Sequence, residues 1–195
     1  MKGIAMNRRT LAALAAPLLL AGCLSFGPKV PDQLFDLTAE NPAPAGAGQS
    51  GSLASALVVE VPETSLELNV TRVPVQIDDA HLAYLKKAAW VERPARLFQR
   101  LLAETLRSRG RLVIDAEAGT GNTPVLSGRL LDMGYDARTS SVVVRFDAVR
   151  VSGPSIATRR FESVVPGIEA KSEAVGPALN RAANDVARQV AEWVG

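Results

Sequence analysis

Cysteine and histidine are nearly absent from this chain: each occurs once in 195 residues, as Cys23 and His81. One cysteine excludes an intrachain disulfide. One histidine among scattered carboxylates is too few ligands for the usual metal sites, so neither a metal nor another cofactor is expected. His81 follows Asp78 and Asp79, but three loop residues do not form a catalytic triad, and no serine stands in a nucleophile elbow. The sequence therefore predicts a solvated loop histidine in a protein without catalytic residues.

Excess basic charge is also missing once the start of the chain is set aside. The formal net charge of +2 comes from 22 basic and 20 acidic residues. Lys2, Arg8 and Arg9 lie in a stretch without acidic residues, and without these three the balance is 22 − 3 = 19 basic against 20 acidic residues, a formal −1. A basic footprint for nucleic acid is therefore absent. The glycine-rich residues 119–122 lead to an expected strand, not to a helix, so a phosphate-binding loop is not expected there.

No apolar run is long enough to span a membrane. The first one, Leu11–Ala21, would be roughly 16 Å long as a helix, against about 30 Å of hydrocarbon in a bilayer. It follows a basic start and precedes small residues, which is the layout of a secretory signal, with Met1 or Met6 as the true start. One alternative is that this run is a buried first helix of the domain. Another is a signal for twin-arginine export, through Arg8-Arg9.

The residues Leu20-Ala21-Gly22-Cys23 resemble the lipobox of bacterial lipoproteins. The resemblance implies a diacylglycerol on the Cys23 thiol, cleavage after Gly22, and a fatty acyl chain such as palmitate on the new amine. Ordinary signal cleavage beside an incidental cysteine is the alternative. Lipoproteins of enteric bacteria that stay at the inner membrane have Asp at the next position, where this chain has Leu24. We therefore expect the outer membrane, facing the periplasm, with the periplasmic face of the inner membrane as the alternative.

Composition divides the chain into three parts. Residues 1–22 are the signal peptide, residues 23–56 a lipidated N-terminus with a linker, and residues 57–195 a single globular domain. The linker, 39–56, is almost entirely Ala, Gly, Pro and Ser, so we expect it to be flexible. Just before it, the apolar patch 34–37 indicates a short edge strand.

Two amphipathic helices and several strands are expected in the domain. Apolar residues recur at spacings of three and four in Arg93–Gly110 and in Glu173–Val194. Short β-rich runs separated by turns lie at 57–61, 72–77, 111–115, 124–134, 141–151 and 156–165. The predicted fold class is α/β (α+β type), a two-layer sandwich of a mainly antiparallel sheet with both helices packed on one face.

Tyr84 and Trp90 stand in "LAYLKKAAWVERP", just ahead of the first helix. They are the candidate contact residues for a partner or a lipid. The alternative is that they pack in the core and staple the chain to the helix. Lys86 and Lys87 between them are expected on a solvated face.

The stretch 57–115 resembles the ABC-type transport auxiliary lipoproteins, which include the paraquat-inducible protein C type. Members have a lipobox and a Tyr-x-Leu strand, for which this chain has Phe35-Asp36-Leu37, with Phe in place of Tyr. They continue with strands like "LVVEVP" and "RVPVQI", and then with a tyrosine, a tryptophan and a proline that match Tyr84, Trp90 and Pro94.

This resemblance implies a non-enzymatic, membrane-tethered component of an envelope transporter. Its partners would be an MCE-family substrate-binding protein and an ABC permease and ATPase, a system thought to move lipids between membranes. A lipoprotein chaperone or scaffold for an outer-membrane assembly, of the lipopolysaccharide-insertion type, is the alternative function. A periplasmic hydrolase is disfavoured because the catalytic constellation is missing.

Overall fold

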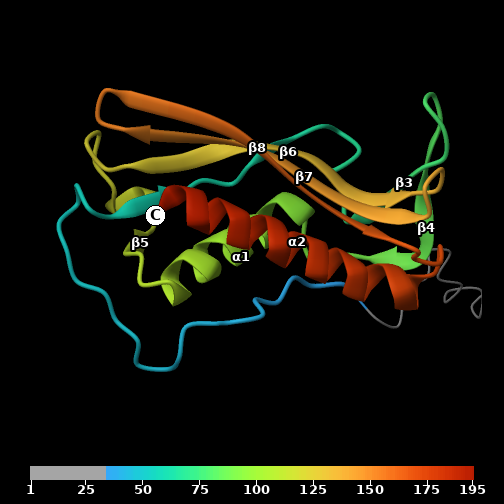
Figure 1. Ribbon diagram of the computed structural model, residues 1–195, viewed down its shortest axis with the longest axis horizontal. Helices are drawn as coiled ribbons and strands as arrows, with labels where there is room; N and C mark the ends of the chain where they lie inside the picture. Colours follow the sequence, from blue (N-terminus) through green and yellow to red (C-terminus); the bar gives the residue numbers. More distant parts are fainter. Residues whose placement is uncertain (1–33) are drawn as a thin grey trace, which may run out of the picture. The chain divides into compact units, whose positions relative to one another are not determined.

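The computed structural model describes residues 34–195, which contain one eight-stranded sheet and two α-helices. Both helices cover the same face of the sheet (Figure 1), which confirms the predicted fold class. The signal segment and Cys23 lie outside the described residues. In chain order the elements are β1 Leu57–Val59, β2 Glu63–Thr64, β3 Arg72–Gln76, β4 Leu82–Ala89, α1 Pro94–Ser108, β5 Val113–Ile114, the 3-10 turn η2 Ala116–Ala118, β6 Val125–Asp136, β7 Ser141–Ser152, β8 Ser155–Pro166 and α2 Ser172–Val194.

Strand β6 organises the sheet because both of its edges are used. Along one edge it pairs antiparallel with β7, which pairs antiparallel with β8. Its other edge pairs with β1, β2 and β3 in turn, each parallel and over two residue pairs. Strand β4 adds to β3 antiparallel, and β5 adds to β1 parallel. The long pairings are thus the antiparallel hairpins that short turns predict, and the parallel ones are short contacts between distant segments.

The core lies between the sheet and the helices. Alternate residues of β7 face the helices and are fully buried, as expected for a strand with one covered face: Val142, Val144, Phe146 and Ala148. The ring of Phe98 in α1 meets the ring of Phe146 edge to face, with centroids 5.2 Å apart. The buried side of α2 is mostly alanine and valine, so this helix can approach the sheet closely. Between residues 34 and 195 no helix is both long and apolar enough to cross a membrane.

The opposite face of the sheet carries cross-strand ion pairs. Arg145 of β7 joins Asp132 of β6 to Glu162 of β8. On the same three strands, Asp147 pairs with Arg160, which holds the pKa of the Asp147 carboxyl below its ordinary value. Opposite charges on neighbouring strands stabilise the pairing and suit a face in contact with water.

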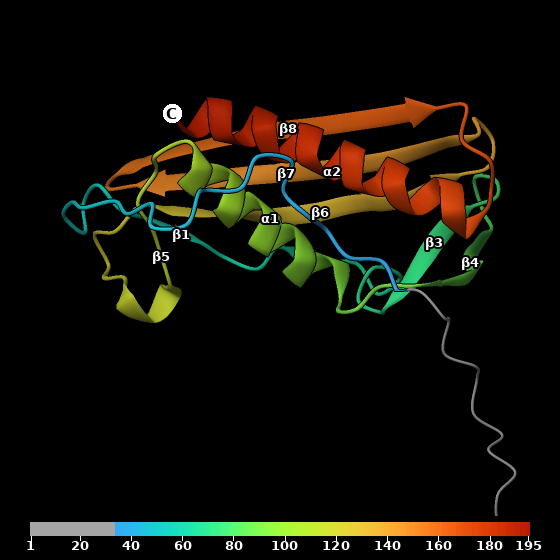
Figure 2. The same ribbon diagram turned by 90° about the horizontal axis from the view of Figure 1, so that it is seen from below.

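Residues 35–43, which we call the strap, run beside both helices (Figure 2). The side-chain oxygen of Asn184 in α2 accepts the backbone N–H of Glu40, and its amide donates to the carbonyl of Thr38, both at 2.9 Å. Asn180 accepts the N–H of Thr38 at 2.9 Å. Composition predicts a flexible chain from residue 39, whereas the structure ties the start of that stretch to α2. The difference arises because the backbone makes these bonds, so a lack of large side chains does not prevent them.

Candidate functional site

Trp90 packs inside the molecule. Its side chain is 2% exposed, and its ring meets that of Phe35 at 5.6 Å between centroids. The backbone holds this contact in place: Phe35 donates its N–H to the carbonyl of Ala89 at 2.7 Å and accepts the N–H of Val91 at 2.9 Å. The arrangement matches the core-packing alternative for Trp90. A partner could reach the ring only if the strap moved.

Tyr84 lies on the other face of the sheet. It pairs with Pro74, and the neighbours of Pro74 on β3, Val73 and Val75, are buried beneath the helices. Because side chains alternate along a strand, Tyr84 faces away from the helices. It is half-buried, and the guanidinium carbon of Arg72 lies 3.9 Å from the centre of its ring. The structure therefore does not bring Tyr84 and Trp90 together on one surface, and a contact role remains a prediction.

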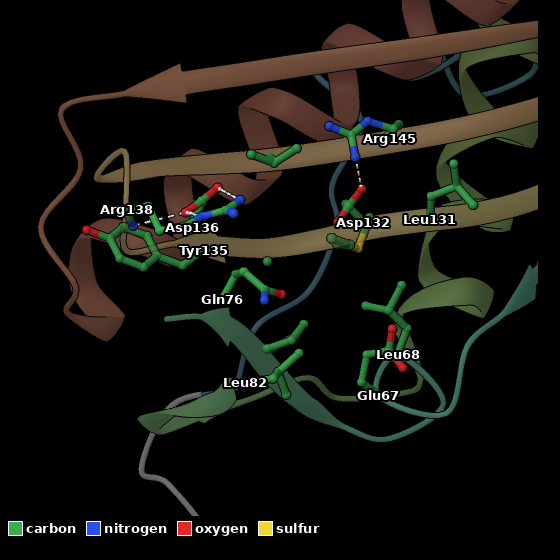
Figure 3. Close-up of a pocket in the computed structure, with 14 residues that line it drawn as sticks. Glu67, Leu68, Gln76, Leu82, Leu131, Asp132, Tyr135, Asp136, Arg138 and Arg145 are labelled. Carbon is green, nitrogen blue, oxygen red and sulfur yellow. Dashed lines mark hydrogen bonds and ion pairs between the residues drawn. The ribbon is translucent and has the colours of Figure 1, made fainter. Parts of the chain in front are cut away.

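A small pocket opens on this outer face, between β3, β4 and β6 (Figure 3). Its volume is about 150 Å³, and Gln76, Leu82, Asp132 and Tyr135 help to line it. Pockets for drug-sized ligands are usually about 300–1,000 Å³. This one is large enough for water or the end of one side chain, but not for a lipid.

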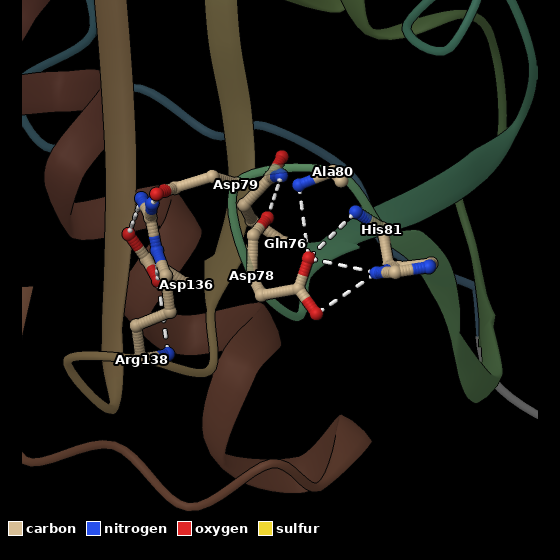
Figure 4. A network of polar contacts seen from close by, with 7 residues as sticks. All are labelled: Gln76, Asp78, Asp79, Ala80, His81, Asp136 and Arg138. Atoms are coloured by element: carbon tan, nitrogen blue, oxygen red, sulfur yellow. Dashed lines mark hydrogen bonds and ion pairs between the residues drawn. The ribbon is translucent and has the colours of Figure 1, made fainter.

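His81 and Asp78 form a pair at the tip of the β3–β4 hairpin (Figure 4). The Nδ1 atom of His81 lies 2.8 and 2.9 Å from the two carboxylate oxygens of Asp78. Asp78 also accepts the backbone N–H groups of Ala80 and His81, each at 2.9 Å. The bond from Ala80, and then the one from the His81 side chain, hold the pKa of Asp78 below its ordinary value. The carboxylate thus closes a turn, and the histidine is exposed to solvent, as the sequence predicts.

Arg138 connects this hairpin to the β6–β7 turn. Its guanidinium bonds Asp136 at 2.7 Å and also bonds Asp79. The side-chain hydrogen bond from Arg138 is the main reason why the pKa of Asp136 lies below its ordinary value. Both acids are used to hold two loops together. Within residues 34–195 no cluster of three or more potential ligands could hold a metal ion.

A second hollow, of about 570 Å³, lies between the strap and α1. Ala43 donates its backbone N–H to Glu104 of α1 at 2.7 Å, and Arg100 of α1 bonds Asp36 of the strap at 3.3 Å. The hollow is an open groove with polar and apolar walls in similar measure. One of its walls is therefore the strap, of which only the residues from 39 onward are predicted by composition to be a flexible linker.

Comparisons with known proteins agree with this fold. The model of the family described as "ABC-type transport auxiliary lipoprotein component" matches residues 35–191. Protein XCC0632 from Xanthomonas campestris, of family DUF330, has a similar crystal structure, with a TM-score of 0.70 at 15% identity, over 83% of this chain and 94% of that one. The crystal structure of an uncharacterized protein gives 0.67 at 13% identity, over 83% and 97% of the two chains. No curated protein matches the chain.

Proposed function

Because the chain belongs to the ABC-type transport auxiliary lipoprotein family, we propose that it is the lipid-anchored periplasmic component of an envelope transporter and acts by binding. The observation that carries this proposal is the extent of the family match, which begins at Phe35 in the strap and ends in α2. The matched region therefore includes the strap, and residues 23–34, which lead from Cys23 to the strap, precede it. Membership supports a membrane-anchored envelope protein that serves ABC-type transport.

The proposed partner is an MCE-family substrate-binding protein, with its ABC permease and ATPase. The resemblance to the paraquat-inducible protein C type supports this partner. An anchored domain is also suited to such a role, because tethering raises its effective concentration beside a partner at the same membrane.

The proposed anchor is Cys23 at the periplasmic face of the outer membrane. The lipobox residues support acylation, and Leu24 after the cysteine supports the outer membrane. Each buried CH₂ adds about 0.8 kcal/mol, and one acyl chain holds a protein only marginally. Diacylglycerol together with an acylated amine would make the attachment effectively permanent.

Binding without turnover is supported by the polar groups of the described residues. His81 bonds a carboxylate that already closes a turn, and Arg138 bonds two acids. Acid–base catalysis needs a titratable group within reach of a substrate held in place. The pocket on the outer face is too small to hold a lipid, and the groove beside the strap is open to solvent.

Photo-crosslinking in cells tests the partner. A benzoylphenylalanine at Tyr84 should capture an MCE-type protein, whereas one at the exposed Leu53 serves as the control. Intact-mass measurement of membrane-extracted protein should show loss of residues 1–22 plus lipid. A soluble mature chain with an unmodified thiol would contradict the anchor.

His81→Ala tests the mode of action. It removes the imidazole and should leave transport-dependent growth unchanged. Loss of function in a normally folded variant would return a catalytic or metal-binding role to consideration, and the binding proposal would be withdrawn.

A further inference from the structure

The anchored end of the chain enters the domain at a fixed place. Phe35 is joined by two backbone hydrogen bonds to Ala89 and Val91, at the end of β4. From Cys23 to Leu34 the chain advances 34 − 23 = 11 residues, which span at most about 36–40 Å. The end of β4 therefore cannot lie farther than this from the anchored residue, whatever path the intervening chain takes.

The two ends of the domain differ in their distance from that point. Strands β3 and β4 lie at the end where α2 begins, and the C-terminus lies at the other end (Figure 2). At 1.5 Å per residue, the 23 residues of α2 separate these ends by about 35 Å. Of the described surface, the part around β4 is thus the part that the chain connects most directly to Cys23, and the other end of the domain lies about 35 Å beyond it.

Strand β4 has an irregular edge at this place. Arg72 pairs with Ala89 and Pro74 with Tyr84, so a single residue of β3 faces residues 85–88 of β4. Leu85 and Ala88 are buried, and the two residues between them are exposed. The strand thus forms a bulge that projects Lys86 and Lys87 outward.

The backbone of the bulge is strained. Lys87 has φ of 55°, in the left-handed region that disfavours residues with a Cβ atom. Glycine or asparagine would adopt this conformation more easily, yet the chain has a lysine there. Strain of this kind often accompanies a functional surface, because bulges re-aim side chains.

The acidic residues around the bulge do not fully neutralise Lys86 and Lys87. Neither Lys86 nor Lys87 forms an ion pair with another described residue. Of the acids near this end, Glu92 pairs with arginines of α1 and Glu169 pairs with Lys171. The pKa of Glu173 in α2 lies below its ordinary value mainly because of a hydrogen bond from its own backbone and then one from the Ser172 side chain. The charge of Lys87 adds a smaller part, so Glu173 offsets part of the positive charge of the bulge.

Exposed apolar side chains also occur where β4 ends. Leu34 is 45% exposed and Val91 is 47% exposed, and both adjoin the Phe35–Trp90 contact. Basic groups beside exposed apolar ones are typical of surfaces that rest on an anionic membrane, where lysines bind headgroups and apolar side chains enter the interface.

We propose that the β4 bulge, with Lys86, Lys87, Leu34 and Val91, contacts anionic phospholipid headgroups in the leaflet that holds the Cys23 anchor. This rests on the lipid anchor of the proposed function and adds an orientation: β4 faces the membrane, and the β7–β8 turn points away from it. The contact would hold the domain against the bilayer within the reach that the anchor allows.

Site-specific labelling of the acylated chain tests this orientation. The chain has no cysteine besides Cys23, so Val91→Cys and, at the far end, Ser155→Cys can each carry a single environment-sensitive fluorophore. The protein is reconstituted in two kinds of vesicle, both of which contain a headgroup nitroxide. One is made of phosphatidylethanolamine and phosphatidylglycerol, and in the other phosphatidylcholine replaces the phosphatidylglycerol. We expect the label at residue 91 to be quenched at least threefold more than the label at residue 155, in the anionic vesicles only.

Charge variants supply the matched control. Lys86→Gln with Lys87→Gln should weaken the contact about thirtyfold, because each lysine near an anionic surface contributes a factor of about five. Arg107→Gln with Arg181→Gln removes the same charge from exposed helical positions and should leave quenching unchanged.

Several results would overturn the proposal. The proposal is wrong if both labelled positions are quenched equally, if residue 91 is not quenched, or if quenching is the same with and without phosphatidylglycerol. In each of these cases, flotation of the chain with the vesicles would still support the anchor. A chain that carries no lipid and does not float would contradict the anchor and this proposal together.

Discussion

The ring of Phe35 meets the ring of Trp90 edge to face, with centroids 5.6 Å apart and an angle of 81° between the planes. This contact joins the N-terminal segment to the core beside the start of α2. Gly176 of α2 makes room for it, because a Cβ atom there would lie 2.8 Å from the Phe35 ring. The chain is therefore part of the folded domain from Phe35 onward.

Phe35→Ala should detach the start of the strap and lower the free energy of unfolding by about 2 kcal/mol. Truncation of a fully buried phenylalanine costs about 3–5 kcal/mol, and this ring is half-buried. Urea denaturation of the chain with Cys23→Ser measures the loss. Leu53→Ala, at an exposed position, should stay within about 0.5 kcal/mol of the parent. If Phe35→Ala also stayed within this range of the parent, the packing of its ring against Trp90 would be contradicted.

Gly176→Ala should destabilise the parent and stabilise the Phe35→Ala variant. Alanine favours a helix over glycine by about 1 kcal/mol, but in the parent its methyl group would strike the Phe35 ring. Without that ring only the helical preference remains. A double-mutant cycle from urea melts measures the coupling. The same sign in both backgrounds would show that the strap does not pack on α2.

Asn184→Ala should free the middle of the strap. The amide group bonds both Glu40 and Thr38, and its loss leaves a backbone donor and acceptor without these partners, at about 1–3 kcal/mol. Hydrogen exchange at the Glu40 amide should become at least about tenfold faster. Asn122→Ala, in an exposed loop, is the control and should leave this amide unchanged.

Arg138→Gln should remove a stabilisation that depends on pH. The ordinary pKa of the Asp136 carboxyl is 3.8, and the bond from Arg138 lowers it in the folded protein. A lowered folded pKa stabilises the protein above the unfolded pKa, and this gain disappears as pH falls through the folded value. The difference in unfolding free energy between parent and variant should thus be constant above about pH 5 and shrink below 3.8. Arg181→Gln should show no such change with pH.

Local patterns predict the elements whose contacts are local. Spacings of three and four residues identify both helices, and the turn at Gly153 joins the long hairpin of β7 and β8. Such signals need only neighbouring residues, because a helix or a tight hairpin repeats its contacts along the chain. The family resemblance, read from the same residues, is confirmed by the match over 35–191.

The candidate contact residues show where local patterns fail. In a regular strand Tyr84 and Trp90 would lie on the same face, because both positions are even. The bulge of residues 85–88 breaks this alternation, so one ring faces solvent and the other enters the core. The two lysines at the centre of the bulge further weaken the sequence pattern that indicates a strand. For this reason β4 is missing from the expected elements.

The sequence by itself determined the helices, the main hairpins, the family and, through the residues around Cys23, the predicted anchor. Tertiary structure alone decided the course of the strap, the burial of Trp90 and the bulge in β4. The physical reason is that these features depend on distant partners: Asn184 for the strap, Phe35 for Trp90 and β3 for the bulge. A segment rich in alanine, glycine and proline contains no periodic pattern, yet its backbone N–H and C=O groups bind wherever the fold presents a polar side chain.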